Sequence, residues 1–285
     1  MKVTQLLLLT GISMAVLTSC DKDIAPTPTL PPVTKPTPGN GQTPPPATPI
    51  PTTPPVTTPP VTTPPAPVTA NSLLTQMGSR KFTYDAQKRL VEVDFLQQPY
   101  LGFTIVYEGN RPVRINKDTG GWMTYTYVGD KVSEVHSYYG EGLVNYWYKF
   151  EYEGNLLVKK TTLSFARSAI GQLGVNTYKY DANGNLLEIA VRWSTDNQEA
   201  NLSNPSIITW GNYNNLPNPM PYVEDGIYLP GIKLFKTSPG YRDTGGGKEF
   251  YSYLAHDSGM PQKRYTTLEA YPHVPATGEE YTYQP

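Results

Sequence analysis

Residues 180–189 read YDANGNLLEI, and the interpretation of the whole chain starts from this stretch. Three side chains carry oxygen at alternate positions: Asp181, Asn183 and Asn185. Alternating oxygen ligands open an EF-hand calcium loop, which also needs Gly at its sixth position and Glu at its twelfth. Here those positions hold Leu186 and Arg192. The sequence therefore predicts a tight turn whose backbone is hydrogen-bonded by Asp181, and no calcium site.

The pattern recurs along the chain. YDAQKRLVEV, which starts at Tyr84, repeats the pattern. Both stretches read Tyr-Asp-Ala, then three polar residues, then Leu, an aliphatic residue, Glu and another aliphatic residue. Shorter copies start at Tyr107, Tyr127 and Tyr152, each with a Gly-Asn or Gly-Asp pair two residues on. Such pairs tolerate the positive φ that two-residue hairpin turns demand. Each copy is therefore predicted to be a β-hairpin.

Apolar and polar residues alternate before each turn. The apolar pairs are Phe82/Tyr84, Ile105/Tyr107, Tyr125/Tyr127, Phe150/Tyr152, Tyr178/Tyr180, Ile208/Trp210, Tyr251/Tyr253 and Tyr281/Tyr283. Alternation with a period of two predicts strands that have one apolar and one polar face. The predicted fold class is all-β: an extended, curled antiparallel meander of repeated hairpins, with roughly 14 strands and its apolar face covered.

The start of the chain predicts a membrane anchor. Residues 1–19 are interpreted as a lipoprotein signal peptide, because Lys2 precedes an apolar run too short for a comfortable membrane span. The run ends in LTSC, which resembles the lipobox of bacterial lipoproteins, and the resemblance implies a diacylglycerol on Cys20. Cys20 is the only cysteine, so it forms no internal disulfide. The predicted partner of this end is a membrane, reached through the lipid.

A proline-rich segment follows. Residues 20–70 are predicted to hold the lipidated cysteine and a disordered Pro/Thr-rich stalk. Of the 30 prolines in the chain, 18 lie between Pro26 and Pro67. Proline fixes φ and removes backbone donors, so this segment favours polyproline II and builds no core. Residues 71–285 are long enough to form a single β domain.

The repeats carry a family resemblance. The pattern Tyr-Asp-x-x-Gly-x-Leu at 180–186 resembles YD repeats, also called RHS repeats, whose proteins form long, spiralling β-hairpin sheets. The chain is also similar to bacterial prolipoproteins of unknown function, in which a segment like WGNYNNLPNP (residues 210–219) often follows such hairpins. The resemblance covers residues 80–220, so 71–285 is interpreted as a YD-repeat-like β domain. It implies a Gram-negative cell-envelope location and no particular activity.

Location follows from the anchor and the resemblance. The predicted site is the outer membrane, with the lipid-anchored protein on its surface or periplasmic face. The alternative is the inner membrane, because Asp21 directly after the lipidated cysteine resembles a retention signal of some Gram-negative bacteria.

Charge and motifs exclude several functions. The net charge of −1 gives no field that steers the chain to nucleic acid, and no nucleic-acid partner is predicted. Two Asp-Thr-Gly triplets, at Asp118 and Asp243, resemble those of pepsin-like proteases, but their flanking residues do not fit. The chain has no GxSxG elbow and no paired-histidine motif. The sequence therefore predicts a monomer that is not an enzyme and has no cofactor or metal.

The predicted function is that of a lipid-anchored cell-envelope protein that presents a non-catalytic β-sheet binding domain on a stalk. The ligand is a glycan, a protein or an envelope polymer. One alternative is a structural or spacer subunit of an envelope assembly, and another is a hydrolase with a dispersed active site.

Ligand candidates are tryptophans off the regular apolar pairs: Trp122, Trp147 and Trp193. Trp147 alternates with Tyr146 and Tyr148 and is predicted to point to the polar face, where an aromatic ring can stack on a sugar. Residues 214–247 are interrupted by five prolines and are predicted to be mostly loop, or an irregular cover over part of the sheet.

Overall fold

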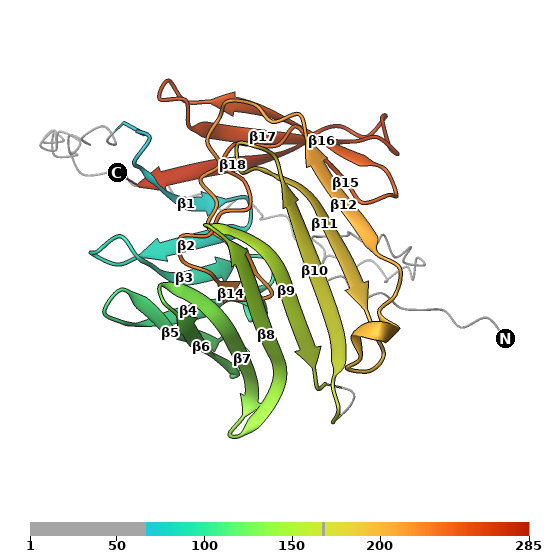
Figure 1. Cartoon of the computed structure of the whole chain (residues 1–285). Coiled ribbons are helices and arrows are strands. Elements are labelled where there is room, and N and C mark those ends of the chain that lie inside the picture. Colours follow the sequence, from blue (N-terminus) through green and yellow to red (C-terminus); the bar gives the residue numbers. More distant parts are fainter. Residues whose placement is uncertain (1–66, 167–168, 285) are drawn as a thin grey trace, which may run out of the picture. The chain divides into compact units, whose positions relative to one another are not determined.

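The computed structural model describes residues 67–166 and 169–284, which belong to one unit, Pro65–Pro285. Cys20 and the predicted stalk up to residue 66 lie outside these residues, so lipidation and the stalk stay predictions. Sixteen strands form one antiparallel sheet that closes on itself, with the first strand paired to the last (Figure 1).

The strands follow one another around the barrel in sequence order. The first eight are β1 (Leu73–Met77), β2 (Arg80–Tyr84), β3 (Leu90–Phe95), β4 (Phe103–Glu108), β5 (Arg111–Lys117), β6 (Trp122–Val128), β7 (Lys131–Gly140) and β8 (Leu143–Glu153). The other eight are β9 (Leu156–Ser164), β10 (Gln172–Tyr180), β11 (Leu186–Trp193), β12 (Ser206–Gly211), β15 (Tyr241–Asp243), β16 (Lys248–Ala255), β17 (Pro261–Leu268) and β18 (Thr277–Gln284). The remaining elements are the 3₁₀ helices η1 (Pro99–Leu101) and η2 (Glu199–Asn201), and a separate two-stranded sheet of β13 (Val223–Glu224) and β14 (Ile227–Tyr228).

The predicted fold class is confirmed in part. The chain is all-β and its hairpins pair antiparallel in sequence order, as the repeats indicate. The prediction of an extended, curled meander missed the closure of the sheet into a barrel. The barrel has 16 strands, where the repeats predicted roughly 14.

The closure has a local cause that repeats in five hairpins. In each, the strand register shifts directly before the turn-entry tyrosine: Thr83/Tyr84, Val106/Tyr107, Thr126/Tyr127, Glu151/Tyr152 and Lys179/Tyr180. A β-bulge of this kind bends its strand and increases the local twist. Because the bulges recur at the same place in successive hairpins, their bends add, and the sheet curves until its two edges meet.

The same tyrosines join neighbouring hairpins. Four of them donate a hydrogen bond from Oη to a main-chain carbonyl of the preceding hairpin at 2.7–2.9 Å: Tyr107 to Leu90, Tyr127 to Pro112, Tyr152 to Val132 and Tyr180 to Leu157. Burial raises the pKa of Tyr127 to about 12, so its phenol stays protonated and keeps donating at physiological pH. The repeated tyrosine thus fixes both the bend and the spacing between hairpins.

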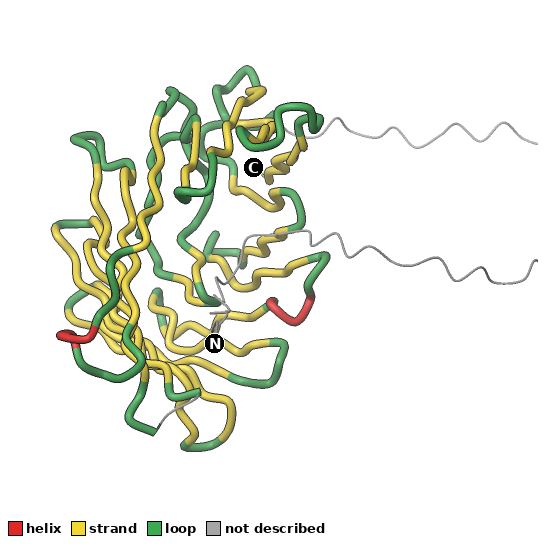
Figure 2. The backbone as a smooth tube through the Cα atoms, turned by 90° about the vertical axis from the view of Figure 1, so that its right-hand side faces the viewer, coloured by secondary structure: helices red, strands yellow, loops and turns green. Residues whose placement is uncertain are grey.

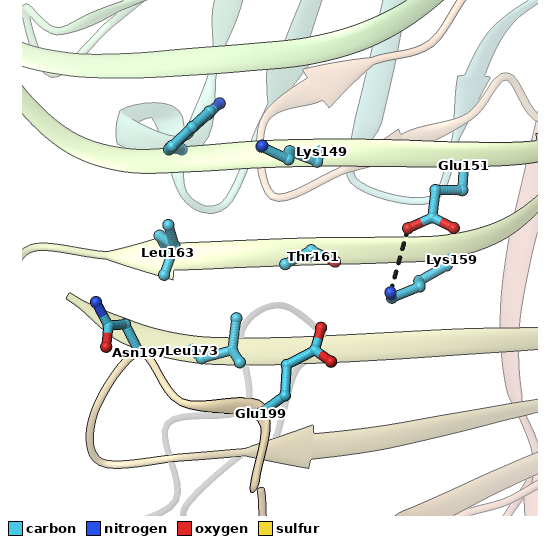
Figure 3. Close-up of a pocket in the computed structure, with 9 residues that line it drawn as sticks. Lys149, Glu151, Lys159, Thr161, Leu163, Leu173, Asn197 and Glu199 are labelled. Atoms are coloured by element: carbon cyan, nitrogen blue, oxygen red, sulfur yellow. Dashed lines mark ion pairs between the residues drawn. The ribbon is translucent and has the colours of Figure 1, made fainter. Parts of the chain in front are cut away.

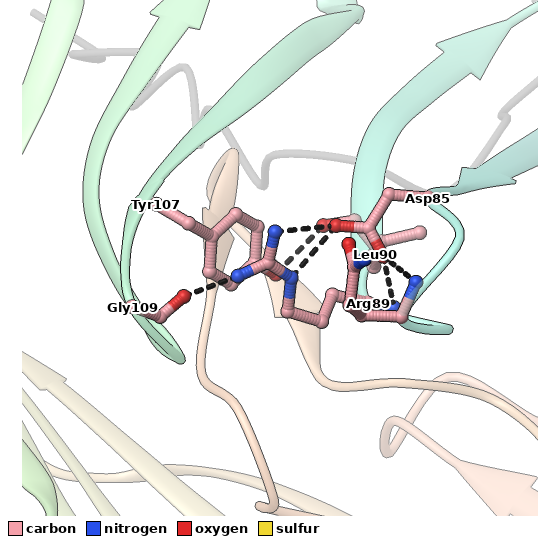
Figure 4. A network of polar contacts seen from close by, with 6 residues as sticks. Asp85, Arg89, Leu90, Tyr107 and Gly109 are labelled. Atoms are coloured by element: carbon pink, nitrogen blue, oxygen red, sulfur yellow. Dashed lines mark hydrogen bonds and ion pairs between the residues drawn. The ribbon is translucent and has the colours of Figure 1, made fainter.

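A cation covers the ring of three of these tyrosines. Arg89 lies over Tyr107 with its Cζ 4.5 Å from the ring centroid, and it also donates to the carbonyl of Gly109 (Figure 4). Its Nη2 lies 2.7 Å from Oδ2 of Asp85, the acidic residue of the first long repeat. Arg111 over Tyr127 and Lys131 over Tyr152 repeat the arrangement in the next two hairpins.

The turn at the best-preserved repeat has the predicted form. Oδ1 of Asp181 accepts hydrogen bonds from the backbone N–H groups of Asn183 and Asn185, at 2.9 and 2.8 Å. Gly184 has a φ of 82°, which favours glycine at this position. The backbone role predicted for Asp181 is therefore confirmed.

The lumen is filled with protein. Large apolar side chains of the strands are buried inside the barrel, among them Phe82, Phe103 and Met123. Residues 212–240, which connect β12 to β15 and are called the plug from here on, add to the same core. In Figure 1 the plug strand β14 lies inside the ring of strands. A barrel of 16 strands is otherwise wide enough for an aqueous channel.

Candidate functional site

The plug is the first candidate for a functional element, because it determines whether the barrel is open. The hairpin β13–β14 turns at Asp225 and Gly226, with φ values of 54° and 72°. An Asp-Gly pair between two short apolar runs is a strong hairpin signal. The sequence prediction of mostly loop for 214–247 missed this hairpin, although its Asp-Gly pair is typical of a hairpin turn. The predicted cover also proves to lie within the barrel.

One end of the plug is held by the repeat with which the sequence analysis begins. Asn185 is 2% exposed, and its Oδ1 accepts hydrogen bonds from the backbone N–H groups of Lys236 and Thr237, both at 2.9 Å. Next to it, the N–H of Leu186 donates to the carbonyl of Leu234 at 2.9 Å. Sequence reasoning treated Asn185 as a turn residue and missed this contact with the plug.

An ion cluster holds the middle of the plug. Lys160 on β9 points into the lumen and is 3% exposed. Its Nζ lies 2.8 Å from Oε1 of Glu224 and 2.8 Å from Oδ2 of Asp225. A charge this deeply buried is stable only when it is paired and hydrogen-bonded. Lys160 therefore joins the barrel wall to the plug.

Electrostatics keep this cluster ionised. Burial by itself lowers the pKa of Lys160, but the carboxylates of Glu224 and Asp225 outweigh burial and hold that pKa well above its ordinary value. Tyr222 donates from Oη to Oε2 of Glu224 at 2.6 Å. Burial and the Glu224 charge raise the pKa of Tyr222, so this phenol remains a donor.

A third part of the wall, β6, holds the plug through a pair of tyrosines. Tyr125 on β6 donates from Oη to the carbonyl of Tyr228 at 2.9 Å and accepts from the N–H of Tyr228 at 3.2 Å. Together with Lys160 on β9 and Asn185 before β11, this contact fixes the plug at three separate places on the wall. Figure 2 shows the loops enclosed by the strands from a second direction.

The outer wall of the barrel carries charged side chains beside exposed apolar ones such as Val106, Ile207 and Phe250. Cross-strand ion pairs lie along it: Glu134–Lys149 at 3.7 Å, Glu151–Lys159 at 3.2 Å, Lys179–Glu188 at 2.8 Å and Lys263–Glu280 at 3.3 Å. A transmembrane barrel has the reverse arrangement, with an apolar band outside and a polar interior. Four ion pairs on the outside are therefore atypical of a lipid-facing wall.

A groove on the outer wall is the second candidate site. Its volume is about 330 Å³, and it lies over β8, β9 and β10 (Figure 3). Its lining residues are Trp147, Lys149, Glu151, Lys159, Thr161, Leu163, Leu173, Asn197 and Glu199. Asn197 and Glu199 come from the loop between β11 and β12, which covers one side of the groove. The lining carries two lysines and two glutamates, so its charges balance.

Two of the predicted ligand candidates lie on the outer wall in one aromatic strip. Trp147 stands opposite His136, with ring centroids 5.4 Å apart, and its indole N–H donates to Glu134 at 3.1 Å. Trp122 stacks on Tyr138 at 5.4 Å, and Tyr138 contacts His136 at 6.4 Å. Trp147 alone of these residues lines the groove. The prediction that Trp147 points to the polar face is confirmed.

Trp193 does not belong to this strip. It is 45% exposed at the end of β11 and stands opposite Gly174, where any Cβ would collide with its ring. The register of Gly174 with Thr162, a buried residue of the inner face, places Trp193 at the rim of the barrel. A ligand role for Trp122, Trp147 or Trp193 stays a prediction.

Metal chemistry finds no support in the described part of the chain. Residues 67–166 and 169–284 contain no group of three or more His, Cys, Asp or Glu side chains that could hold a metal ion. Within the same residues, no helix is long and apolar enough to cross a membrane. The sequence prediction that the protein is not an enzyme remains a prediction.

Comparisons with known proteins identify the fold. No family model matches the chain, and no curated protein matches it. A porin-like protein from Bacteroides vulgatus shares the fold with a TM-score of 0.52 at 14% identity, over 75% of this chain and 100% of that one. A porin-like protein from Bacteroides uniformis aligns with a TM-score of 0.48 at 13% identity, over 75% of this chain and 94% of that one. At these identities the likeness shows the barrel fold alone, and it rests on the first structure.

The predicted function requires a correction. The sequence predicted a lipid-anchored protein that presents a non-catalytic β-sheet binding domain on a stalk. The sheet instead closes into a barrel like that of porin-like proteins, and its apolar face surrounds the plug. The predicted function is therefore wrong, and its two alternatives, a spacer subunit and a hydrolase with a dispersed site, are not retained.

Proposed function

We propose that the protein is a porin-like barrel attached to the outer membrane, with its lumen sealed by the plug. The observation that carries the proposal is Lys160, which joins the wall to the plug through Glu224 and Asp225 at 2.8 Å each. Separating these groups would leave uncompensated charge in the lumen, which costs about 3–5 kcal/mol. The plug therefore stays inside the barrel under ordinary conditions.

The location is part of the proposal. A porin-like fold and the lipobox-like LTSC before Asp21 both support the outer membrane. The ion pairs on the outer wall support a barrel that lies in water at the membrane surface, because charged side chains are destabilising on the lipid face of a barrel. The lipid predicted on Cys20 would then provide the attachment.

The test combines location with conductance. Full-length protein is expected to sediment with outer membranes. Liposomes that carry it are expected to release a small entrapped sugar no faster than liposomes without protein. A photoreactive probe confined to the bilayer interior is expected to label none of the strands β1–β18 in peptide maps. Faster sugar release, or labelling of the strands, would show an open or inserted barrel and refute the proposal.

The groove supports a second proposal about partners. Two lysines balance two glutamates in its lining, which favours a neutral ligand, and Trp147 provides an aromatic wall. A neutral saccharide has this chemistry, because sugar rings stack on indole and their hydroxyl groups bond to charged and amide side chains. A glycan array probed with the full chain is expected to show Trp147-dependent binding. Tyr139→Ala, at an exposed tyrosine outside the lining, is the control. Equal signals from Trp147→Ala and wild type would remove this proposal.

A further inference from the structure

The two ends of the barrel differ in polarity. Because the strands are antiparallel and follow chain order, successive connections alternate between the two ends. One end carries the tight turns of the repeats and both ends of the plug, and is called the turn end from here on. The other, called the loop end, carries among others the connections 78–79, 96–102, 118–121, 141–142 and 269–276.

Exposed apolar side chains gather at the loop end. Among the described residues, every large apolar side chain that is exposed within a connection between barrel strands lies there. Four of these side chains, and two more at the strand ends beside 141–142, are called the apolar rim. They are 43–63% exposed: Leu96, Tyr100, Tyr139, Leu143, Tyr271 and Val274.

The turn end has no comparable rim in the described part of the chain. Its turns carry charged residues, such as Arg89 and Asp130. The exposed large apolar side chains within two residues of these turns lie in strands of three different hairpins: Val128, Leu187 and Leu254. Both ends face solvent, so the apolar rim is a specific property of the loop end.

The connections that carry the rim are neighbours. The strands from β17 through β18 and β1 to β8 are adjacent in the closed sheet, so the five connections follow one another around the loop end. The N–H of Leu96 donates to the carbonyl of Ser79 at 2.8 Å, and the N–H of Asp118 donates to that of Gly102 at 3.0 Å. At about 4.8 Å per strand, the rim covers on the order of 40 Å of the circumference. A partner that contacts all of it must be broad.

The rim loops hydrogen-bond much of their own backbone. The N–H of Leu101 donates to the carbonyl of Gln98 at 2.9 Å, that of Tyr271 to Leu268 at 3.1 Å, and that of Val274 to Tyr271 at 3.0 Å. Backbone groups without partners are costly next to lipid, so loops of this kind can enter a membrane surface at a low cost. Three further positions have no N–H at all: Pro99, Pro272 and Pro275.

The rim loops carry little charge. Connections 96–102, 141–142 and 269–276 contain no Lys or Arg, and their acidic residues are Glu141 and Glu269. Anionic lipids attract basic segments, which these loops lack. Tyrosine side chains are enriched at membrane–water interfaces, because one end of the ring is apolar and the other is polar. The composition therefore favours a neutral lipid surface.

We propose that the apolar rim contacts a neutral phospholipid surface, with Tyr100 and Tyr271 in the headgroup layer and the strands outside the hydrocarbon. This inference rests on the attachment to the outer membrane proposed above, and it adds which end of the barrel faces the lipid. A membrane surface is broad enough to contact all five connections together.

The length of the chain before the barrel is compatible with this orientation. Strand β1 runs toward the connection 78–79 at the loop end, so the chain enters the barrel at the turn end, at Leu73. A fully extended chain as long as residues 21–66 spans on the order of 150 Å. The 11 residues of β8 span only about 35 Å. A lipid on Cys20 therefore leaves the loop end free to face the same membrane.

Electron paramagnetic resonance on the full chain attached to phosphatidylcholine vesicles tests the contact. Spin labels are placed in Tyr100→Cys, in Tyr271→Cys and, as the matched control at the turn end, in Val128→Cys, where the native side chain is 73% exposed. Oxygen concentrates in lipid and a neutral nickel chelate concentrates in water, so the ratio of their collision rates with the label measures depth. This ratio is expected to be about threefold or more higher at positions 100 and 271 than at 128. The wild-type chain, treated with the same label, gives the background from any unacylated Cys20.

Two results would overturn the contact in chain that is attached to the vesicles. One is a ratio at positions 100 and 271 no higher than that at 128. The other is dipolar broadening between labels of Tyr100→Cys, which would place a second copy of the chain on the rim. Added phosphatidylglycerol should leave the ratios unchanged, and a contact that requires this anionic lipid would refute the neutral surface.

Failure of the contact can be distinguished from failure of the proposed function. Release of entrapped sugar with high ratios at positions 100 and 271 would refute the sealing and support the contact. Chain that sediments with the vesicles but has equal ratios at all three positions would refute the contact alone. Chain that does not sediment with the vesicles would refute both the attachment and the contact.

Discussion

The phenol of Tyr107 donates a hydrogen bond to the carbonyl of Leu90 at 2.7 Å, across the gap between two consecutive hairpins. The same contact recurs at Tyr127, Tyr152 and Tyr180, one hairpin after another. Each tyrosine directly follows a β-bulge. One residue type at one place in the repeat therefore sets both the curvature of the wall and the junction between its units.

Removing one such junction should weaken the barrel measurably. Tyr107→Phe keeps the ring and loses the hydrogen bond, so the free energy of unfolding is expected to fall by about 0.5–1.5 kcal/mol. Urea denaturation followed by tryptophan fluorescence measures the change. Tyr139→Phe is the control, because Tyr139 is 63% exposed. Equal stability of Tyr107→Phe and wild type would mean that the bulge alone holds the hairpins in place.

Removing the side-chain oxygen of Asn185 should weaken the attachment of the plug to the wall. Asn185→Ala leaves the buried N–H groups of Lys236 and Thr237 without Oδ1. The expected loss of stability is about 1–3 kcal/mol, together with faster hydrogen exchange at these two amides. Asn183→Ala in the same turn is the matched control, because Asn183 is exposed and only its backbone N–H bonds to Asp181. If both variants exchange alike, Asn185 does not hold the plug.

Lys159 and Lys160 are adjacent but point to opposite sides of the barrel wall, so variants at the two positions can be compared directly. Lys160→Met removes the cation between Glu224 and Asp225, and we expect a loss of about 3–5 kcal/mol with faster exchange in β13–β14. Lys159→Met alters the adjacent residue, whose side chain is 30% exposed and pairs with Glu151 on the outer wall. That change should cost about 0–1 kcal/mol. A result in which the two variants lose equal stability would contradict the buried role of Lys160.

Acid should weaken the turns of the long repeats. Burial raises the pKa of Asp181, but N–H donors, with Asn185 first among them, outweigh burial and hold that pKa below its ordinary value. A carboxyl whose pKa is lower in the folded state stabilises the fold above its unfolded pKa, about 3.9, and loses this effect as the pH falls through the folded value. Asp181→Asn should therefore show a flatter decline of stability between neutral pH and about pH 3.

A matched acidic residue makes this comparison specific. Asp130 pairs with Arg111 in a short turn, and its side chain is 98% exposed. Asp130→Asn is expected to leave the decline in acid unchanged. Urea midpoints at a series of pH values measure both variants. Parallel curves for Asp181→Asn and wild type would show that the turn does not shift the titration of Asp181.

The membrane attachment has its own test. Cys20 closes the lipobox-like LTSC, and its acylation is predicted from the sequence alone. Cells grown with a labelled fatty acid should incorporate the label into the wild-type protein and none into Cys20→Ala. Label in the Cys20→Ala protein would place the lipid elsewhere and remove the argument for a lipobox.

The local structure could be predicted from the sequence because it depends on neighbouring residues. The role of Asp181 in its turn follows from Asx-turn chemistry, and the outward direction of Trp147 follows from strand alternation. The closure of the sheet into a barrel could not be predicted from neighbouring residues. It results from summing small bends over many hairpins, and a bulge before Tyr107 looks the same in the sequence whether the sheet closes or spirals.

Contacts between residues far apart in the sequence could not be predicted either. Asn185 contacts residues near position 236, and Lys160 pairs with residues near 224, so neither contact has a local signal. Lys160 even resembles Lys159, its neighbour on the outer wall. The Asp225-Gly226 pair was the one readable sign of a hairpin within the plug, and the surrounding prolines obscured it.

The pairing of β1 with β18 joins Leu73 to Gln284, the two ends of the domain. Strands so far apart in the chain pair late and slowly during folding. The entropy of closing a long loop is lost before any contact between the strands can offset it. Until then both edges expose unpaired backbone groups that can pair with other chains. The folding chain is therefore most vulnerable to aggregation just before completion, and a factor that shields strand edges would matter more to its yield than one that accelerates hairpin formation.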